Sequence, residues 1–147
     1  MSTIKVDTIQ TRGGVSEIAI DKLKGASSAG SMTVVGEGGT TTTNLQQGLA
    51  KIWSCVTQAS STSFDDSFNC SGITDEATGR FTLAFSNNMN NALYSLTGCT
   101  DANGAVAIYG SANKATSSIQ IQTGDAFGSA GLADYNDAMT TAHGDLA

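Results

Sequence analysis

The C-terminal half of the chain alternates apolar and polar residues with a period of two. Phe81, Leu83 and Phe85 alternate with threonine, alanine and serine, and Ile119 and Ile121 alternate with serine and glutamine. This period is typical of a strand that buries one face. Both segments are therefore predicted to be half-buried β-strands.

Two further apolar runs, residues 93–100 and 105–109, flank the dipeptide Asn103-Gly104. Asn-Gly between two apolar runs is a strong signal for a two-residue hairpin turn. Residues 133–143 alternate poorly and are predicted to be an edge or final strand. The pattern thus predicts an antiparallel arrangement with short connections.

Turn-forming residue types separate these strands. Residues 74–79 and 86–91 are rich in them and are predicted to be loops. About six short strands with this spacing indicate a small antiparallel β-sandwich over residues 62–147. The chain is therefore expected to be mainly β, with its helical signal confined to one short segment.

That helical signal begins at Asn44, which is placed to cap a helix, with Gln47 three residues later at the spacing of a capping box. The apolar positions that follow share one helical face: Leu45, Leu49, Ile52 or Trp53, and Val56. A helix over residues 44–57 is predicted, with a connection to residue 61. Gly48 weakens it by roughly 1 kcal/mol relative to alanine, so its apolar face must dock on the β body or on sister chains.

The N-terminal segment has its own strand pattern. Residues 3–11 alternate, with Ile4 and Val6 on one face, and a Gly-Gly turn then leads to a second apolar run. Residues 1–24 are predicted to be a strand pair, which two strands alone would barely stabilise in water. Residues 25–43 are rich in Gly, Ser and Thr and predict a linker.

The charge distribution narrows the choice of partners. Residues 1–51 carry a net charge of +1 and residues 52–147 carry −7. Because a body of this charge repels phosphate, nucleic acid is an unfavourable partner. No run reaches the roughly 18 apolar residues of a membrane span, and no apolar signal segment follows Met1, so neither membrane insertion nor secretion is expected.

The sequence has no motif for catalysis or for a bound cofactor. The one histidine, His143, has no partner residue in a recognisable motif, and the nucleophile turn of hydrolases is missing. The carboxylate pairs Asp65-Asp66 and Asp75-Glu76 are expected to be solvated loop charges. Neither an enzyme nor a metal or organic cofactor is predicted.

Cysteines and aromatic residues complete the candidate chemistry. The cysteines are odd in number and lack the Cys-x-x-Cys spacing, so we expect them to be reduced, small and buried. Trp53 is predicted to be buried rather than to stack on a sugar, since it follows the helical spacing. The remaining aromatic predictions are core burial for Phe68, Phe81 and Phe85, and glycan binding for Tyr94, Tyr109 and Tyr135.

Several segments of the chain resemble small fibre-type structural proteins of tailed bacteriophages, especially phages of marine bacteria. The resemblance rests on the opening STIKVDTIQTR, the tether VVGEGGTTTTNLQQGL, the strand-like segments DSFNCSGITD, GRFTLAF and NMNNALYSL, and the closing HGDL. These segments span most of the chain, although the chain is much shorter than a long tail fibre.

The resemblance implies a virion protein that is assembled as a homotrimer in the bacterial cytoplasm and attached by its N-terminus. In this hypothesis residues 1–24 bind other virion proteins, and residues 44–57 pack near the three-fold axis. Residues 62–147 then face outward and attach weakly to a host surface glycan, with avidity from three copies. The expected assembly residues are Ile4, Val6, Leu45, Leu49 and Trp53.

Two other classes of function fit the same pattern. A capsid decoration or head fibre protein would use its N-terminal strands to pair with capsid subunits. A carbohydrate-binding module would instead be monomeric and would present an exposed platform of planar aromatic rings. The position of the protein on a particle, and the exposure of its aromatic residues, distinguish these alternatives.

Overall fold

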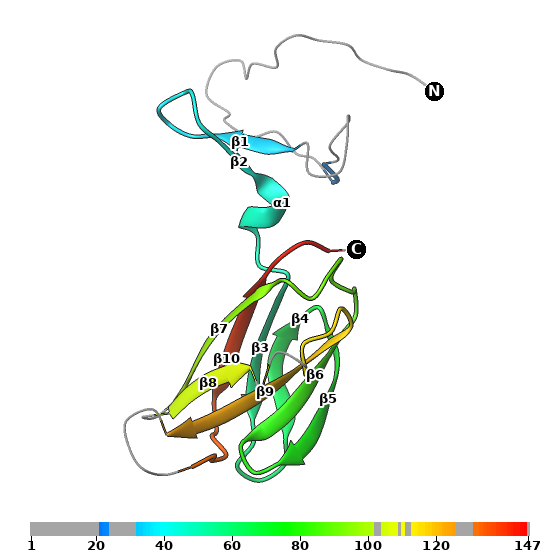
Figure 1. Cartoon of the computed structure of the whole chain (residues 1–147), viewed down its shortest axis with the longest axis vertical. Coiled ribbons are helices and arrows are strands. Elements are labelled where there is room, and N and C mark those ends of the chain that lie inside the picture. Colours follow the sequence, from blue (N-terminus) through cyan, green and yellow to red (C-terminus); the bar gives the residue numbers. More distant parts are fainter. Residues whose placement is uncertain are drawn as a thin grey trace.

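The computed structural model describes residues 21–23, 32–101, 104–108, 110, 113–125 and 131–146. A narrow N-terminal stalk, residues 32–49, leads into a β-rich body that is formed by the described residues from Lys51 onward (Figure 1). The predicted strand pair, with Ile4 and Val6, lies outside the described residues apart from residues 21–23.

The described elements follow one another with short connections. The stalk holds β1 (Thr33–Val35), β2 (Thr42–Asn44) and α1 (Leu45–Gly48). The body holds β3 (Ile52–Thr57), β4 (Ser63–Phe68), β5 (Cys70–Ala77), β6 (Arg80–Phe85), β7 (Ser95–Thr100), β8 (Gly104–Ile108), β9 (Ser118–Asp125) and β10 (Ala138–His143).

The predicted antiparallel β body is confirmed, but it is not a sandwich of two separate sheets. Its strands form one eight-stranded antiparallel sheet in the order β4-β3-β10-β7-β8-β9-β6-β5, curled nearly into a barrel (Figure 1). The two halves are joined where β7 pairs with β8 through Cys99 and Ala105. Inward-facing side chains therefore fill the space between the two halves of a single sheet.

The curl of the sheet follows from its connectivity at Asn69. β4 and β5 form the two opposite edges of the sheet, yet only Asn69 separates them in sequence. Asn69 has a φ of 60°, a conformation that asparagine tolerates better than most residues. Its side-chain amide donates to Lys51 O at 3.0 Å and to Asn87 O at 3.1 Å, and its Oδ1 accepts from Asn87 N at 2.7 Å.

The core lies inside the curled sheet and confirms the clearest alternating patterns. Phe81 and Leu83 of β6 are fully buried, as are Ile119 and Ile121 of β9. The other core residues are Ile52, Val56, Phe85, Met89, Tyr94, Ala138 and Ala142. Period-two alternation thus identified the strands that carry most of the large core side chains.

The helix prediction is correct at its start and wrong beyond its first turn. Asn44 caps the helix, since its Oδ1 accepts from Gln47 N at 3.0 Å, but α1 ends at Gly48. Residues 52–57 form β3, with Ile52 and Val56 buried and the intervening Ser54 also facing inward. Residues four positions apart share a face in both a helix and a strand, so pairing with β4 and β10 decided between them.

Two segments with weak strand patterns nevertheless form regular strands. Within residues 133–143, which were expected to be an edge or final strand, residues 138–143 form the last strand, β10, but it lies in the middle of the sheet between β3 and β7. Its inward residues are Ala138, Thr140 and Ala142, which are too small or polar to produce a strong apolar pattern. In the segment predicted to be a linker, β1 and β2 pair as a hairpin.

The turn between β5 and β6 is shorter than predicted, because β5 continues to Ala77. Gly79 has a φ of 64°, and a Cβ there would lie 2.5 Å from Thr123 O. Its N–H donates to Asp134 Oδ1 at 2.6 Å, and its carbonyl accepts from Thr123 N at 2.8 Å. Glycine therefore allows this turn to pack closely against β9.

The stalk meets the body at Lys51. The Lys51 ammonium donates to Gln46 O in α1, and Lys51 N donates to Ala142 O in β10 at 2.8 Å. Burial lowers the pKa of Lys51, whereas nearby Asp145 acts in the opposite direction. Gln47 Nε2 also donates to Asp145 Oδ1 at 3.3 Å, so the C-terminal segment supports the same junction.

Replacing Phe81 by alanine should destabilise the body strongly. Truncation of a fully buried phenylalanine costs about 3–5 kcal/mol of unfolding free energy. Phe68→Ala is the matched control and should cost the single chain less than about 1 kcal/mol, since Phe68 is exposed on one chain; both variants are compared at a dilution where the chains do not associate. Urea unfolding followed by circular dichroism measures both. Equal losses would contradict the assignment of inner and outer faces.

Candidate functional site

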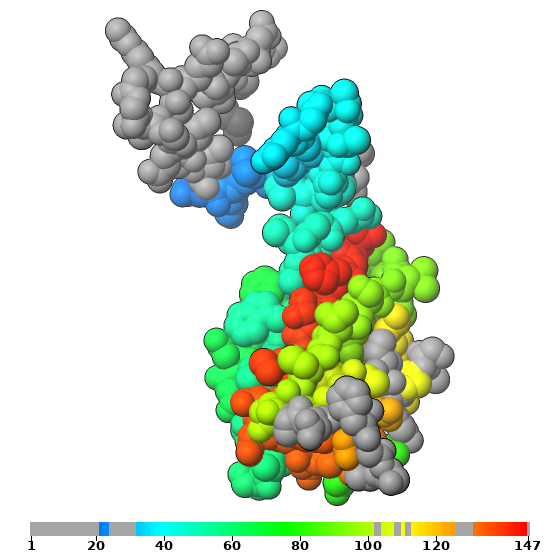
Figure 2. All heavy atoms as spheres, turned by 90° about the vertical axis from the view of Figure 1, so that its left-hand side faces the viewer, coloured from blue at the N-terminus to red at the C-terminus, as the bar shows by residue number. Residues whose placement is uncertain are grey.

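The solvent-facing side of β4, β3, β10 and β7, here called the outer face, carries three large apolar side chains. Trp53 is 38% exposed, Phe68 52% and Met139 38%. Trp53 on β3 pairs in register with Phe68 on β4. Met139 on β10 pairs with Cys55, which lies two residues after Trp53 on β3. Figure 2 shows this side of the body, with β10 in red between β3 and β7. These three residues form the outer apolar patch.

A β-bulge between β3 and β4 explains why sequence reasoning placed Phe68 in the core. Val56 pairs with Phe64 whereas Cys55 pairs with Asp66, so Asp65 is an extra residue in β4. An extra residue reverses which face the following side chains occupy. Phe64 therefore packs against the core while Phe68, four residues later, points outward.

Trp53 is also exposed, contrary to the predicted burial. In a helix it would share a face with Leu49 and Val56, but in β3 it alternates with the buried Ile52 and Ser54. Leu49 is 55% exposed and Leu45 is half-buried. The apolar side chains that were expected to share one face of a single helix therefore lie in different places: Leu45 and Leu49 belong to the stalk, and Trp53 lies on the outer face.

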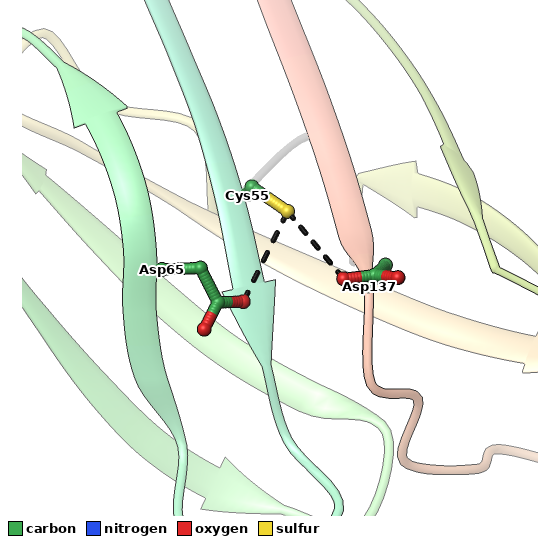
Figure 3. A group of neighbouring side chains, drawn as sticks. All are labelled: Cys55, Asp65 and Asp137. Atoms are coloured by element: carbon green, nitrogen blue, oxygen red, sulfur yellow. Dashed lines mark hydrogen bonds between the residues drawn. The ribbon is translucent and has the colours of Figure 1, made fainter.

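A second feature of the outer face is a cluster of Cys55, Asp65 and Asp137, called the Cys55 cluster (Figure 3). Cys55 Sγ lies 3.9 Å from Asp65 Oδ2 and 3.8 Å from Asp137 Oδ1. One ligand-type atom from each residue lies within 4.8 Å of the other two. The residues come from β3, from the bulge in β4 and from the position before β10.

The electrostatics of the Cys55 cluster keep its thiol protonated. Burial raises the pKa of Cys55, and the negative charges of Asp137 and Asp65 raise it further. Within the described part of the chain, no basic side chain contacts either carboxylate. A thiol with a raised pKa is a poor nucleophile, so this arrangement does not favour covalent catalysis.

The tyrosines predicted to bind glycan are not gathered into a site. Tyr94 is 3% exposed, and its hydroxyl donates to Ala115 O at 3.0 Å. Its ring packs edge-on against Phe85, with centroids 5.9 Å apart. Tyr94 is thus a core residue and cannot stack on a sugar. Tyr135 is half-buried, and Tyr109 lies outside the described residues.

The cysteines are free, but they are not the small buried residues that were expected. Cys99 is exposed, while Cys55 and Cys70 are half-buried. Burial raises the pKa of Cys70 to about 11. Their exposure follows from their places on β3, β5 and β7, which a pattern of isolated cysteines could not reveal.

The two carboxylate pairs lie in strands rather than in turns. Asp65-Asp66 belongs to β4 and Asp75-Glu76 to β5, which are the two edges of the eight-stranded sheet. Charged side chains on edge strands oppose pairing with other chains. The acidic pairs therefore limit uncontrolled sheet extension, a role that depends on topology. His143, exposed, is the last residue of β10.

Comparisons of the chain with protein-family models, curated proteins and solved structures gave no match. None of the helical residues that the structure describes forms a segment long and apolar enough to cross a membrane. The outer apolar patch and the Cys55 cluster therefore have to be interpreted from their own geometry.

Sequence reasoning missed the Cys55 cluster because its members are distant in the chain. Asp137 is 82 positions from Cys55 and has no motif around it. Asp65 is only ten positions away, but its orientation depends on the bulge. Only the pairing of β3 with both β4 and β10 brings the three side chains together.

Alkylation by iodoacetamide at about pH 8, near the ordinary pKa of a free thiol, should modify Cys99 before Cys55 or Cys70. Cys99 is exposed, whereas the raised pKa values of the other two thiols reduce their thiolate fractions. Asp137→Asn should accelerate modification of Cys55 and leave Cys70 unchanged. Peptide mass spectrometry measures the extent of alkylation at each cysteine over time. Faster modification of Cys55 than of Cys99 in the unmodified sequence would contradict the assigned environment.

Proposed function

We propose that this protein is a structural virion protein, a trimeric tail fibre or spike that attaches a bacteriophage to the surface of its host. The observation that carries the proposal is the amount of apolar surface left exposed on one described chain. Besides the outer apolar patch, Val34, Val35 and Leu49 of the stalk are each more than half exposed. Apolar surface of this kind marks sites of association in soluble proteins.

The arrangement of stalk and body supports the same proposal. The stalk leaves one end of the body, and the C-terminal segment lies at that end as well (Figure 1). The turns between β3 and β4 and between β5 and β6 lie at the opposite end (Figure 1). Attachment through residues 1–24 would then direct these turns away from the particle.

The charge distribution fits an outward body. Residues 52–147 carry −7, which favours solubility and opposes contacts between neighbouring spikes. In a trimer, three bodies on one spike could bind the host surface together. The overall avidity would then come from the high effective concentration of the second and third sites rather than from one tight site. The resemblance to phage fibre proteins gives this proposal its biological context.

A carbohydrate-binding module is the second candidate, and Trp53 with Phe68 favours it. The two aromatic residues are cross-strand neighbours, and both are exposed on the outer face. Exposed aromatic rings can stack on the apolar face of a sugar, a role that the sequence pattern assigned to the tyrosines instead. The two candidates differ in what they require of Trp53. A glycan can stack only on an exposed ring, whereas a trimer interface would bury the ring between chains.

The full chain should sediment as a trimer at micromolar concentration, and replacing Trp53 and Phe68 together by serine should shift it to monomer. Loss of apolar surface from an interface removes the energy that holds it together. Leu93→Ser is the matched control, because Leu93 is 88% exposed but lies in the loop before β7. A folded monomer for the unmodified sequence would end the trimer proposal.

Glycan binding can be tested with the same tryptophan. Trp53 is the only tryptophan of the chain, so its fluorescence reports on the outer apolar patch alone. If the carbohydrate candidate is correct, soluble polysaccharide from the host surface should change this emission, and Phe68→Ala should weaken binding by about fivefold or more, as expected for one aromatic contact. Tyr135→Ala should leave the titration unchanged. An emission that no polysaccharide alters would favour the interface function.

A further inference from the structure

The Cys55 cluster has the chemistry and the spacing of a metal site. A tetrahedral zinc ion with Zn–S of about 2.3 Å and Zn–O of about 2.0 Å places sulfur and oxygen about 3.5 Å apart. The distances from Cys55 Sγ to the Asp65 and Asp137 oxygens, 3.9 and 3.8 Å, exceed this by only a few tenths of an ångström. The two carboxylate oxygens, which lie within 4.8 Å of each other, would have to approach to about 3.3 Å, so rotation of the exposed Asp65 and Asp137 side chains is needed to bring all three atoms onto one ion (Figure 3).

The oxygens around Cys55 also outnumber the hydrogens that could bridge them. In addition to the two sulfur contacts, Thr57 Oγ1 lies 2.8 Å from Asp65 Oδ2 and 2.7 Å from Asn136 O. A thiol and a hydroxyl carry one hydrogen each, so they can bridge two of these four contacts. Of the two contacts left without a hydrogen, only the one at Thr57 Oγ1 brings two acceptor oxygens close together, because the sulfur contacts are longer than van der Waals distance. A cation among them would relieve this excess of acceptors, and Asp65 and Asp137 have no basic partner in the described residues.

The ligand set selects the kind of cation. Calcium takes six to eight oxygen ligands, and magnesium prefers octahedral oxygen and water, so neither is suited to a site with a sulfur ligand. Zinc accepts thiolate and carboxylate in one tetrahedral site, and cobalt follows it closely in geometry. The half-exposed position of Cys55 leaves room for water as a fourth ligand.

We propose that Cys55, Asp65 and Asp137 bind a divalent transition-metal cation of the zinc type on the outer face. The bound ion ties the edge strand β4 and the segment before β10 to β3. Binding replaces the thiol proton, which passes to solvent, so the ion is held by one thiolate and two carboxylates. This site does not depend on the proposed fibre function, because it is formed within one chain.

Titration of the full-length protein with Co²⁺ under reducing conditions tests the site directly. A thiolate ligand gives a sulfur-to-cobalt charge-transfer band, which should disappear in Cys55→Ser and persist in Cys99→Ser. Zn²⁺ should displace the cobalt, and Asp65→Asn or Asp137→Asn should weaken zinc binding by at least about tenfold, the loss typical of even an outer-shell partner. Asp66→Asn is the matched control, because Asp66 adjoins Asp65 but its Oδ1 accepts from Ser67 N.

Thermal unfolding of the unmodified protein provides a measurement that requires no variant. Added Zn²⁺ should raise the melting temperature relative to protein held in chelator, since a ligand that binds the folded state stabilises it. Absence of both the cobalt band and the melting shift would overturn the proposal. A band that survives in Cys55→Ser, with circular dichroism showing a folded protein, would overturn it as well, because the thiolate would then belong to another residue.

Discussion

The connection through Asn69 is the constraint on which the rest of the structure depends. A single residue joins the two edge strands of one eight-stranded sheet, so the sheet has to curl until its edges come together at this corner, although β4 and β5 do not pair with each other. The curl in turn encloses Phe81, Leu83, Ile119 and Ile121, whose burial offsets the cost of ordering the chain. Four hydrogen bonds between the Asn69 side chain and Lys51 or Asn87, two donated and two accepted by Asn69, fix this corner beside the stalk.

One irregularity, the bulge opposite Cys55 and Val56, gives the outer face both of its distinctive features. The extra residue Asp65 turns Phe68 outward beside Trp53, and its own carboxylate reaches Cys55. Because a regular β4 would keep Phe64 and Phe68 on the same face, it would lack this exposed ring. The outer apolar patch and the Cys55 cluster are thus two consequences of the same local change in register.

The proposed function follows from surface and shape rather than from reactive groups. Apolar residues along the stalk and on the outer face provide surface for association, while acidic pairs on β4 and β5 discourage sheet extension at the edges. Association through faces, combined with protected edges, is suited to a closed oligomer rather than to open-ended growth. A metal on the outer face would strengthen β4, the edge strand that carries Phe68.

The strands with large alternating side chains, the cap at Asn44 and the mainly β class could all be predicted from the amino-acid sequence. These features depend on residues close together in the chain, where period and capping chemistry act locally. Tertiary structure decided that residues 52–57 form a strand, because Ile52 and Val56 share a face in either conformation and only pairing with β4 and β10 distinguishes them. It also decided the central place of β10 and the meeting of Cys55 with Asp137, since register between strands distant in sequence leaves no mark on local spacing.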